Sequence, residues 1–434
     1  MEEYIKLLLE QIRCRKIHPY IEEEIRGHLE EQTEDFIRQG MSREEAEHLA
    51  VLDMGDPAEA GASLDRIHRP KIAWSTLLLV KMLAIFAVLI QAKIRGEFGG
   101  DRFLLHTFIG ILVMSVITLA DYRLLARYAK IAAGLIAATV IYFIWRGGGN
   151  LAFIGAIQFG GLQFSLFHLL MLYIPLYGAL LYSFRGAGYA ALLKSAVWML
   201  IPVISVFFRF NFSTGALLLF SLSFLLAFAV REGWFAVSKK MVLAAAAAVN
   251  LSFIGVFFLG LGAGSFDWSG RLQDFYQMKK AQEFVRELSG LFVSGGEGIR
   301  EETMQFAVQM FSRDFLLVYL SEALGIFAAA ALCLLLAVLL FKVFSTALGQ
   351  KDPLGRILGC GCGLVFSMNF LMYLLGNLGI FPMMQTFLPY FSAGGSGILL
   401  SYTLTGIVLS IYRHKDLPLS ERQRVSSLFA RTGE

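Results

Sequence analysis

Charged residues are scarce in this chain of 434 residues: Asp, Glu, Lys and Arg make up 17%, whereas a soluble globular protein carries about 25%. Proline is also rare, with 9 residues and no low-complexity tract, which argues against a disordered chain. The four cysteines do not form a disulfide framework, and Cys360 and Cys362 are too close together for a zinc site. We expect no signal peptide, because the first residues are charged and amphipathic.

Apolar residues dominate the composition. Hydrophobic residues account for 56% of the chain, and the mean hydropathy is +0.62. The 38 phenylalanines and 42 glycines fit helices packed in lipid, where small residues allow helices to approach closely. The composition is typical of a polytopic membrane protein.

The formal net charge of +4 conceals an uneven distribution. Residues 1–71 contain 17 of the 34 acidic residues against 10 basic ones, a net of −7, and the rest of the chain carries a net of +11. This difference places a domain boundary near Pro70 and predicts a small soluble domain followed by a membrane domain.

Residues 1–70 have the pattern of short amphipathic helices with narrow apolar stripes. Gly40 is predicted to end one helix, and Ser42 with Glu45 three residues later forms a capping box for the next. A Gly-Asp-Pro sequence that ends at Pro57 precedes the last helix. The domain contains no catalytic constellation, which excludes a soluble-domain enzyme in this segment.

From residue 72 the chain is a series of apolar runs, most of about 20 residues, a length that crosses about 30 Å of hydrocarbon. We therefore predict an all-α fold, a bundle of ten transmembrane helices with a small N-terminal cytoplasmic helical domain. The predicted spans are 72–92, 103–120, 126–145, 160–183, 189–208, 213–231, 239–262, 315–343, 353–378 and 391–412.

The distribution of Lys and Arg predicts the orientation of these spans. With the N-terminal domain in the cytoplasm, the short inner loops hold more basic residues than the short outer loops, as the positive-inside rule requires. An even number of spans returns the Arg-rich tail, residues 416–434, to the cytoplasm. We therefore expect a multi-pass protein of the cytoplasmic membrane with both termini inside.

One outer segment, residues 263–314, is a loop of about 50 residues between the seventh and eighth spans. Connections of that length are usually functional or disordered. Eight of the acidic residues cluster here between Asp267 and Asp314, and apolar residues at helical spacing predict an amphipathic helix at the outer interface.

Two acidic residues close to the eighth span are candidates for chemistry. Asp314 lies where the loop meets a helix start, so it is either an N-cap that accepts backbone N–H bonds or a catalytic base at the outer membrane surface. Glu322 lies about two turns inside the predicted span, where an acid is costly enough to be a functional candidate by default. The alternative for Glu322 is an acid satisfied by hydroxyl groups or water of the bundle.

A second constellation precedes the tenth span. Leu388-Pro389 is followed by Ser392-Ala393-Gly394-Gly395-Ser396. Taken alone, this sequence is only a tight loop or a surface on which helices pack.

Together the two constellations resemble the SEDS family, the FtsW/RodA/SpoVE group of polytopic membrane proteins. The family pattern runs Thr-Asp-Phe followed by Glu-Leu-Gly near the eighth span, and Leu-Pro followed by Ser-Tyr-Gly-Gly-Ser before the tenth. Here Asp314-Phe315 is followed by Glu322 and by Leu324-Gly325, and Asp121-Tyr122-Arg123 matches a further family motif after the second span. The resemblance covers about residues 72–415. Departures include Arg313 in place of Thr, Ala393 in place of Tyr, and loss of a polar motif at the fourth span.

The resemblance implies a peptidoglycan glycosyltransferase that polymerises lipid II at the outer face of the membrane, in division, elongation or sporulation. It assigns the catalytic base to Asp314 and a supporting place in the substrate cavity to Glu322. The loop that closes the cavity would contain Ser392, Gly394, Gly395 and Ser396. The leaving diphosphate requires cationic groups or a divalent metal ion, and the nearest cationic side chains are Arg271, Lys279, Lys280 and Arg313.

The resemblance also implies partners. A class B penicillin-binding protein would accompany the polymerase, and no nucleic acid is expected. Residues 1–70 separately resemble a permease prefix domain of the HAAS type, which implies a regulatory or scaffolding role. The departures in the cavity leave a second hypothesis open, a non-catalytic scaffold or lipid-binding regulator of envelope assembly. A secondary transporter has no support, because no inverted repeat or pair of broken helices is evident.

Overall fold

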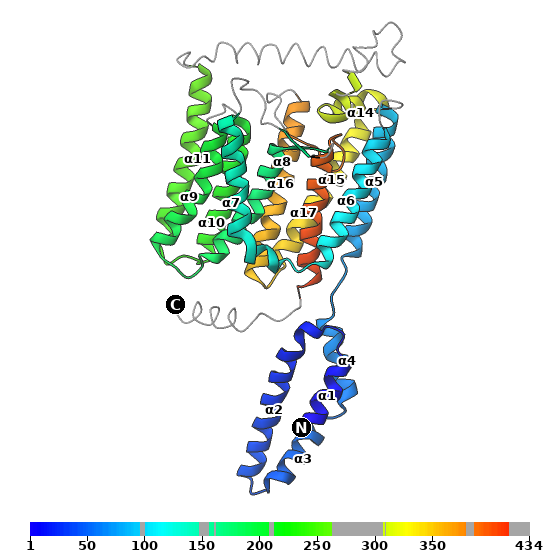
Figure 1. Ribbon diagram of the computed structural model, residues 1–434, viewed down its shortest axis with the longest axis vertical. Helices are drawn as coiled ribbons and strands as arrows, with labels where there is room; N and C mark the ends of the chain where they lie inside the picture. The colour runs from blue at the N-terminus through cyan, green and yellow to red at the C-terminus, as the bar shows by residue number, and fades with distance from the viewer. Residues whose placement is uncertain are drawn as a thin grey trace. The chain divides into compact units, whose positions relative to one another are not determined.

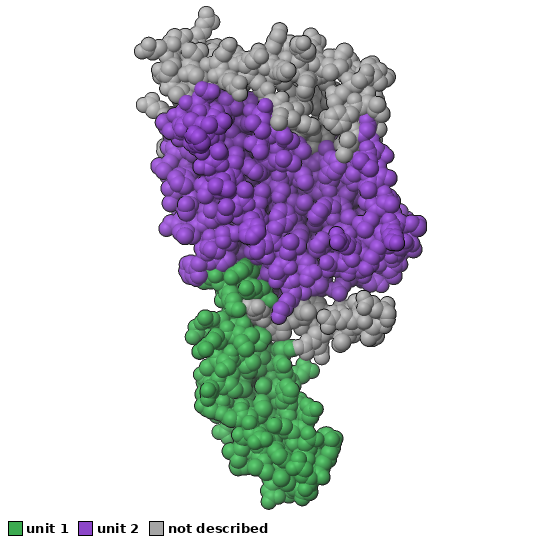
Figure 2. Space-filling model, turned by 180° about the vertical axis from the view of Figure 1, so that it is seen from behind, with its two compact units in different colours: residues 1–72, 412–434 green, residues 73–411 purple. Residues whose placement is uncertain are grey.

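The computed structural model describes residues 1–95, 100–146, 156–159, 162–207, 212–262, 307–308, 310–378 and 386–415. The chain divides into two compact units, residues 1–72 with 412–434 and residues 73–411, coloured green and purple in Figure 2. Each unit is built from helices that pack on their own apolar core.

The first unit contains four α-helices and one 3₁₀ turn. Its elements are α1 (Glu2–Glu10), η1 (Arg15–Ile17), α2 (His18–Arg38), α3 (Arg43–Asp53) and α4 (Pro57–His68). Apolar side chains of α1, η1 and α2 form the centre of its core, including Leu8, Ile21 and Leu29, which are almost completely buried. The charged residues lie on the opposite faces, so each helix is amphipathic as predicted.

Local rules determine where these helices begin and end. Gly40, with φ +96°, follows the end of α2, and Ser42 and Glu45 form the predicted capping box at the start of α3. Asp56 caps α4 by accepting a hydrogen bond from the backbone N–H of Ala58 at 3.0 Å. The predicted boundaries inside this unit are therefore confirmed.

In its described residues, the second unit contains ten long apolar helices, shown side by side in Figure 1. Within the described residues, eight helices are long and apolar enough to cross a membrane, while the apolar helix at His168–Ser183 is shorter. The ten helices match the ten predicted spans and are α5 (Trp74–Arg95), α6 (Gly100–Leu119), α7 (Arg123–Arg146), α8 (Leu166–Ser183), α9 (Tyr189–Phe207), α10 (Phe212–Arg231), α11 (Lys239–Gly262), α15 (Ile326–Leu348), α16 (Pro353–Asn377) and α17 (Gly395–Arg413).

Helix α16 is the centre of this bundle and packs against α8, α10 and α15. Small residues allow the close approach. A Cβ atom on Gly361 would lie 2.8 Å from the Cα of Pro175 in α8, and a Cβ atom on Gly359 would lie 2.6 Å from the Cβ of Ala347 in α15. The glycines of α16 therefore determine how near its neighbours lie.

Two predicted spans have different boundaries in the structure. The fourth was expected at 160–183, but its helix α8 begins at Leu166, and the residues before it form an antiparallel hairpin of β1 (Ala156–Phe159) and β2 (Leu162–Ser165). The eighth was expected as one helix over 315–343. It is broken at Gly325, with φ +85°, into the short helix α14 (Leu316–Leu324) and the span α15.

Most of the predicted loop 263–314 lies outside the described residues, including its expected interfacial helix. Its last residues are described, and they enter the bundle immediately before α14.

Candidate active site

Asp314 lies in a turn between the helical residues 310–313 and helix α14. The N-cap position of α14 belongs to Phe315, and no side chain caps this helix. The backbone N–H of Asp314 donates to the carbonyl of Met310 at 2.9 Å, so the turn is held by main-chain bonds. Of the two predicted roles for Asp314, the N-cap is therefore wrong, and its carboxylate remains available for chemistry.

The Asp314 carboxylate is half-buried, with 32% of its side chain exposed, and Arg313 Nε lies 3.7 Å from its Oδ1. Burial raises the pKa of Asp314 to about 6, although the positive charge of Arg313 opposes this change. Among the described residues, Arg313 is the only partner of the carboxylate. A carboxylate with a pKa near neutrality is a suitable general base, because it is ionised at pH 7 and still accepts a proton readily.

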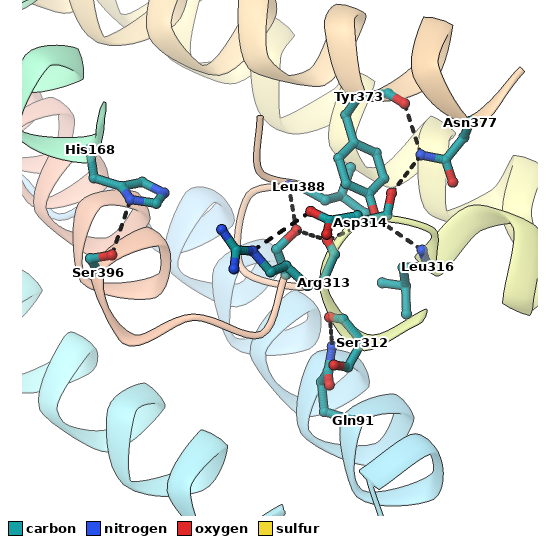
Figure 3. Close-up of polar contacts among 11 residues, drawn as sticks. Gln91, His168, Ser312, Arg313, Asp314, Leu316, Tyr373, Asn377, Leu388 and Ser396 are labelled. Atoms are coloured by element: carbon teal, nitrogen blue, oxygen red, sulfur yellow. Dashed lines mark hydrogen bonds and ion pairs between the residues drawn. The ribbon is translucent and has the colours of Figure 1, made fainter. Parts of the chain in front are cut away.

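The main chain around Asp314 is held by side chains of α16 (Figure 3). The hydroxyl of Tyr373 donates to the carbonyl of Arg313 at 3.2 Å and accepts from the N–H of Leu316 at 3.0 Å. The amide Nδ2 of Asn377 donates to the carbonyl of Asp314 at 3.0 Å. These bonds secure both sides of the turn, so Asp314 is presented on a rigid support.

The residues before α17, the 386–394 loop, hold the same turn from the other side. Ser392 Oγ donates to the carbonyl of Arg313 at 2.9 Å and accepts from the N–H of Leu388 at 2.7 Å. The N–H of Ala393 donates to the carbonyl of Ser312 at 2.8 Å. The two sequence constellations, more than 70 residues apart, are therefore in direct contact.

A second polar pair lies beside Arg313 (Figure 3). Ser396 Oγ, in the first turn of α17, is 3.0 Å from Nδ1 of His168 in α8, and the His168 ring packs against Phe387. Arg313, His168 and Ser396 together offer polar groups to an anionic or hydroxylated ligand next to Asp314.

The structure corrects the predicted place of Glu322. Because the chain breaks at Gly325, Glu322 lies on the separate helix α14, before the span α15, and its side chain is exposed. Its supporting place in the substrate cavity stays a prediction. The predicted continuous helix was wrong because an apolar run does not show where a backbone with positive φ interrupts a helix.

The other predicted residues divide into three groups. Arg313 and Ser396 lie at the site, and Gly395 directly precedes Ser396 at the start of α17. Ser392 is buried and its hydroxyl supports the turn, whereas Gly394 is exposed. Three predicted cationic residues lie outside the described residues: Arg271, Lys279 and Lys280.

Sequence reasoning missed several polar residues of this site, namely Gln91, His168, Tyr373 as a hydrogen-bond donor, and Asn377. Gln91 and His168 are polar groups inside apolar runs, which is a signal for function or for a buried hydrogen-bond network. In the part of the chain that the structure describes, no group of three or more His, Cys, Asp and Glu side chains is placed to hold a metal ion.

A family profile described as "Cell cycle protein", FtsW/RodA/SpoVE, matches residues 71–417. The chain is 27% identical over 124 residues to the peptidoglycan glycosyltransferase RodA of Mycobacterium leprae, covering 29% of this chain and 27% of that protein. It is 32% identical over 98 residues to the probable peptidoglycan glycosyltransferase FtsW of Bacillus subtilis, covering 23% and 24%. These alignments thus span only about a quarter of the length of the relatives.

Solved structures show a likeness over most of the membrane unit. A chain from a peptidoglycan synthase complex that coordinates polymerization and crosslinking matches with a TM-score of 0.63 at 18% identity, over 80% of this chain and 99% of that one. The rod shape determining protein RodA of Thermus thermophilus matches with a TM-score of 0.55 at 20% identity, over 79% and 97%. The folds are therefore alike. Because the family profile matches the whole membrane unit, the chain belongs to the FtsW/RodA/SpoVE family of cell cycle proteins.

Proposed function

We propose that this protein is a peptidoglycan glycosyltransferase that polymerises lipid II into glycan strands, with Asp314 as the general base. The observation that carries the proposal is the half-buried Asp314 carboxylate, whose pKa is raised to about 6 and which is held by main-chain bonds beside Arg313. The names of the relatives support the reaction class.

In this reaction the 4-hydroxyl oxygen of the acceptor sugar attacks the anomeric carbon of the donor. The new C–O bond forms while the bond to undecaprenyl diphosphate breaks, and the hydroxyl proton passes to Asp314. The leaving diphosphate takes the electron pair of the broken bond. The guanidinium of Arg313 stabilises this developing negative charge, and the His168–Ser396 pair supplies hydrogen-bonding groups on the same side of the site.

The site faces the outside of the bacterial cytoplasmic membrane in this proposal, and both termini lie in the cytoplasm. Residues 1–70 form a cytoplasmic prefix domain with a regulatory or scaffolding role. A class B penicillin-binding protein acts with the polymerase, by analogy with the complex that coordinates polymerization and crosslinking. The process served is division, elongation or sporulation.

The test is polymerisation of lipid II by the purified full-length protein, with glycan strands separated on a gel. Asp314→Asn is expected to lower the rate of strand formation on the order of 100- to 10,000-fold. Glu232→Gln is the matched control, because Glu232 is also a carboxylate beside an arginine, 2.9 Å from Arg356, with a similar exposed fraction of 35%.

Two outcomes would contradict the proposal. Strands made at the wild-type rate by Asp314→Asn would remove Asp314 from the mechanism. A wild-type protein that binds lipid II without making strands would instead support the non-catalytic scaffold.

A further inference from the structure

Gln91 is a polar residue in the last turns of the apolar helix α5, and its side chain is completely buried, with 0% exposed. Its Nε2 donates hydrogen bonds to the carbonyl of Ser312 at 2.7 Å and to the carbonyl of Phe391 at 2.6 Å. These acceptors lie 221 and 300 residues further along the chain. One side chain therefore joins α5, the Asp314 turn and the 386–394 loop, and Figure 3 shows its contact with Ser312.

The chemistry of this contact requires a primary amide. Two carbonyl oxygens face one nitrogen, and an amide NH₂ group has the two N–H donors that they need. A carboxylate has no donor, and an apolar side chain of the same length would leave both carbonyls without this bond in a buried place, which is costly. Gln91 thus contributes a specific pair of bonds as well as filling volume.

Gln91 supports the turn from α5, a helix that supplies none of the other supports described above. Tyr373 and Asn377 hold the carbonyls of Arg313 and Asp314 from α16, and Ser392 holds Arg313 from the 386–394 loop. Among the described residues, Gln91 is the one side chain of α5 that bonds to this turn. Its second bond fixes the same turn relative to the loop that leads to Ser396.

We propose that Gln91 is a positioning residue for catalysis: by binding the carbonyls of Ser312 and Phe391 together, it sets the place of Asp314 relative to the ligand-facing start of α17. This inference rests on the proposed glycosyltransferase function. The general base must lie within hydrogen-bond reach of the acceptor hydroxyl, and a displacement of about 1 Å costs up to about 100-fold in rate. Gln91 touches no reacting atom, so it acts through Asp314.

The experiment measures kcat and KM for lipid II polymerisation by full-length variants, together with their thermal unfolding in detergent. Gln91→Met keeps the length and volume of the side chain and removes both donors. We expect kcat to fall about 10- to 100-fold while KM changes by less than about twofold, because ground-state binding does not depend on the exact place of the base. Gln91→Asn retains the donors on a shorter side chain and should give an intermediate kcat.

Asn369→Leu is the matched control. Asn369 is equally buried, at 0% exposed, but its Nδ2 donates at 2.8 Å to the carbonyl of Val365 in its own helix. Its replacement should leave kcat unchanged even if the unfolding temperature changes. This control separates the loss of a buried amide in general from the loss of the bonds that Gln91 makes.

The outcomes distinguish this inference from the proposed function. If the wild type is active and a folded Gln91→Met variant has the same kcat, the positioning role alone is overturned. Equal losses of kcat in Gln91→Met and Asn369→Leu also overturn it, because they indicate a general packing effect. A wild-type protein that makes no strands overturns the proposed function, and the positioning role with it.

Discussion

Helix α16 has an Asp–Arg pair near each of its two ends, and the two pairs have different environments. At the N-terminal end, Arg123 Nε lies 3.7 Å from Asp352, and at the C-terminal end, Arg313 Nε lies 3.7 Å from Asp314. Asp352 is 5% exposed and also accepts from the hydroxyl of Tyr122 at 2.6 Å and from the N–H of Leu354 at 3.0 Å. Asp314 has no such additional donors among the described residues.

The difference shows how one residue type serves two purposes. The oxygens of Asp352 accept two hydrogen bonds and form an ion pair with Arg123, so its charge is stabilised and the loops it joins are fixed. Apart from the Arg313 pair, the oxygens of Asp314 have no donor among the described residues, and the bonds that locate the residue are made to its main chain. The structural carboxylate thus has its acceptors filled, whereas the carboxylate of the proposed base has acceptors open to a substrate.

The strongest test of this comparison is a parallel Asp→Asn substitution at both ends. Asp314→Asn should lower the polymerisation rate on the order of 100- to 10,000-fold without lowering the unfolding temperature. Asp352→Asn should leave the rate per folded molecule nearly unchanged but cost about 2 kcal/mol of stability, because Arg123 and Tyr122 lose a charged partner. Rate assays measure the polymerisation rate and thermal unfolding measures stability. Equal changes of rate and stability in the two variants would contradict the comparison.

The pH dependence is a second test. Because the pKa of Asp314 is raised to about 6, the rate should be constant above that pH and fall about tenfold per pH unit below it, as the base becomes protonated. Arg313→Gln removes the positive charge that lowers this pKa, so the midpoint should move to higher pH. Initial rates between pH 4.5 and 8.5 measure the midpoint, and an unshifted midpoint in Arg313→Gln would mean that the pair is not electrostatically coupled.

The smallest expected effect concerns packing along α16. Gly359→Ala should cost about 1–3 kcal/mol of stability, because its Cβ would lie 2.6 Å from that of Ala347. Gly376→Ala, near the active-site end, should cost little, since no heavy atom lies within 4 Å of a Cβ there. Thermal unfolding of the two variants compares the two ends of the helix. Equal losses of stability would show that both ends are equally close-packed.

Features that depend on neighbours in the sequence were predictable. The two residues of the capping box, Ser42 and Glu45, are three positions apart. The length and composition of each apolar run are enough to indicate a membrane span. The motif residues Asp314 and Ser392 were also identified, and the structure brings their segments together.

Features that depend on distant contacts or on one backbone angle were not predictable. The bonds from Gln91 join residues more than 200 positions apart, and no local pattern contains them. The break at Gly325 is a single positive φ angle inside an apolar run, so Glu322 was assigned to the wrong environment. The strand Leu162–Ser165 was included in a helix because a short apolar run fits either structure.

The supports of Asp314 all bind main-chain carbonyls, those of Ser312, Arg313 and Asp314 itself. Every amino acid has a carbonyl group, so residues in this turn can be exchanged during evolution without the loss of any of these bonds. Arg313 stands where relatives are expected to have threonine, and the turn is still held by five donors. The side chains of this turn can therefore change while the main-chain position of Asp314, the proposed base, is kept.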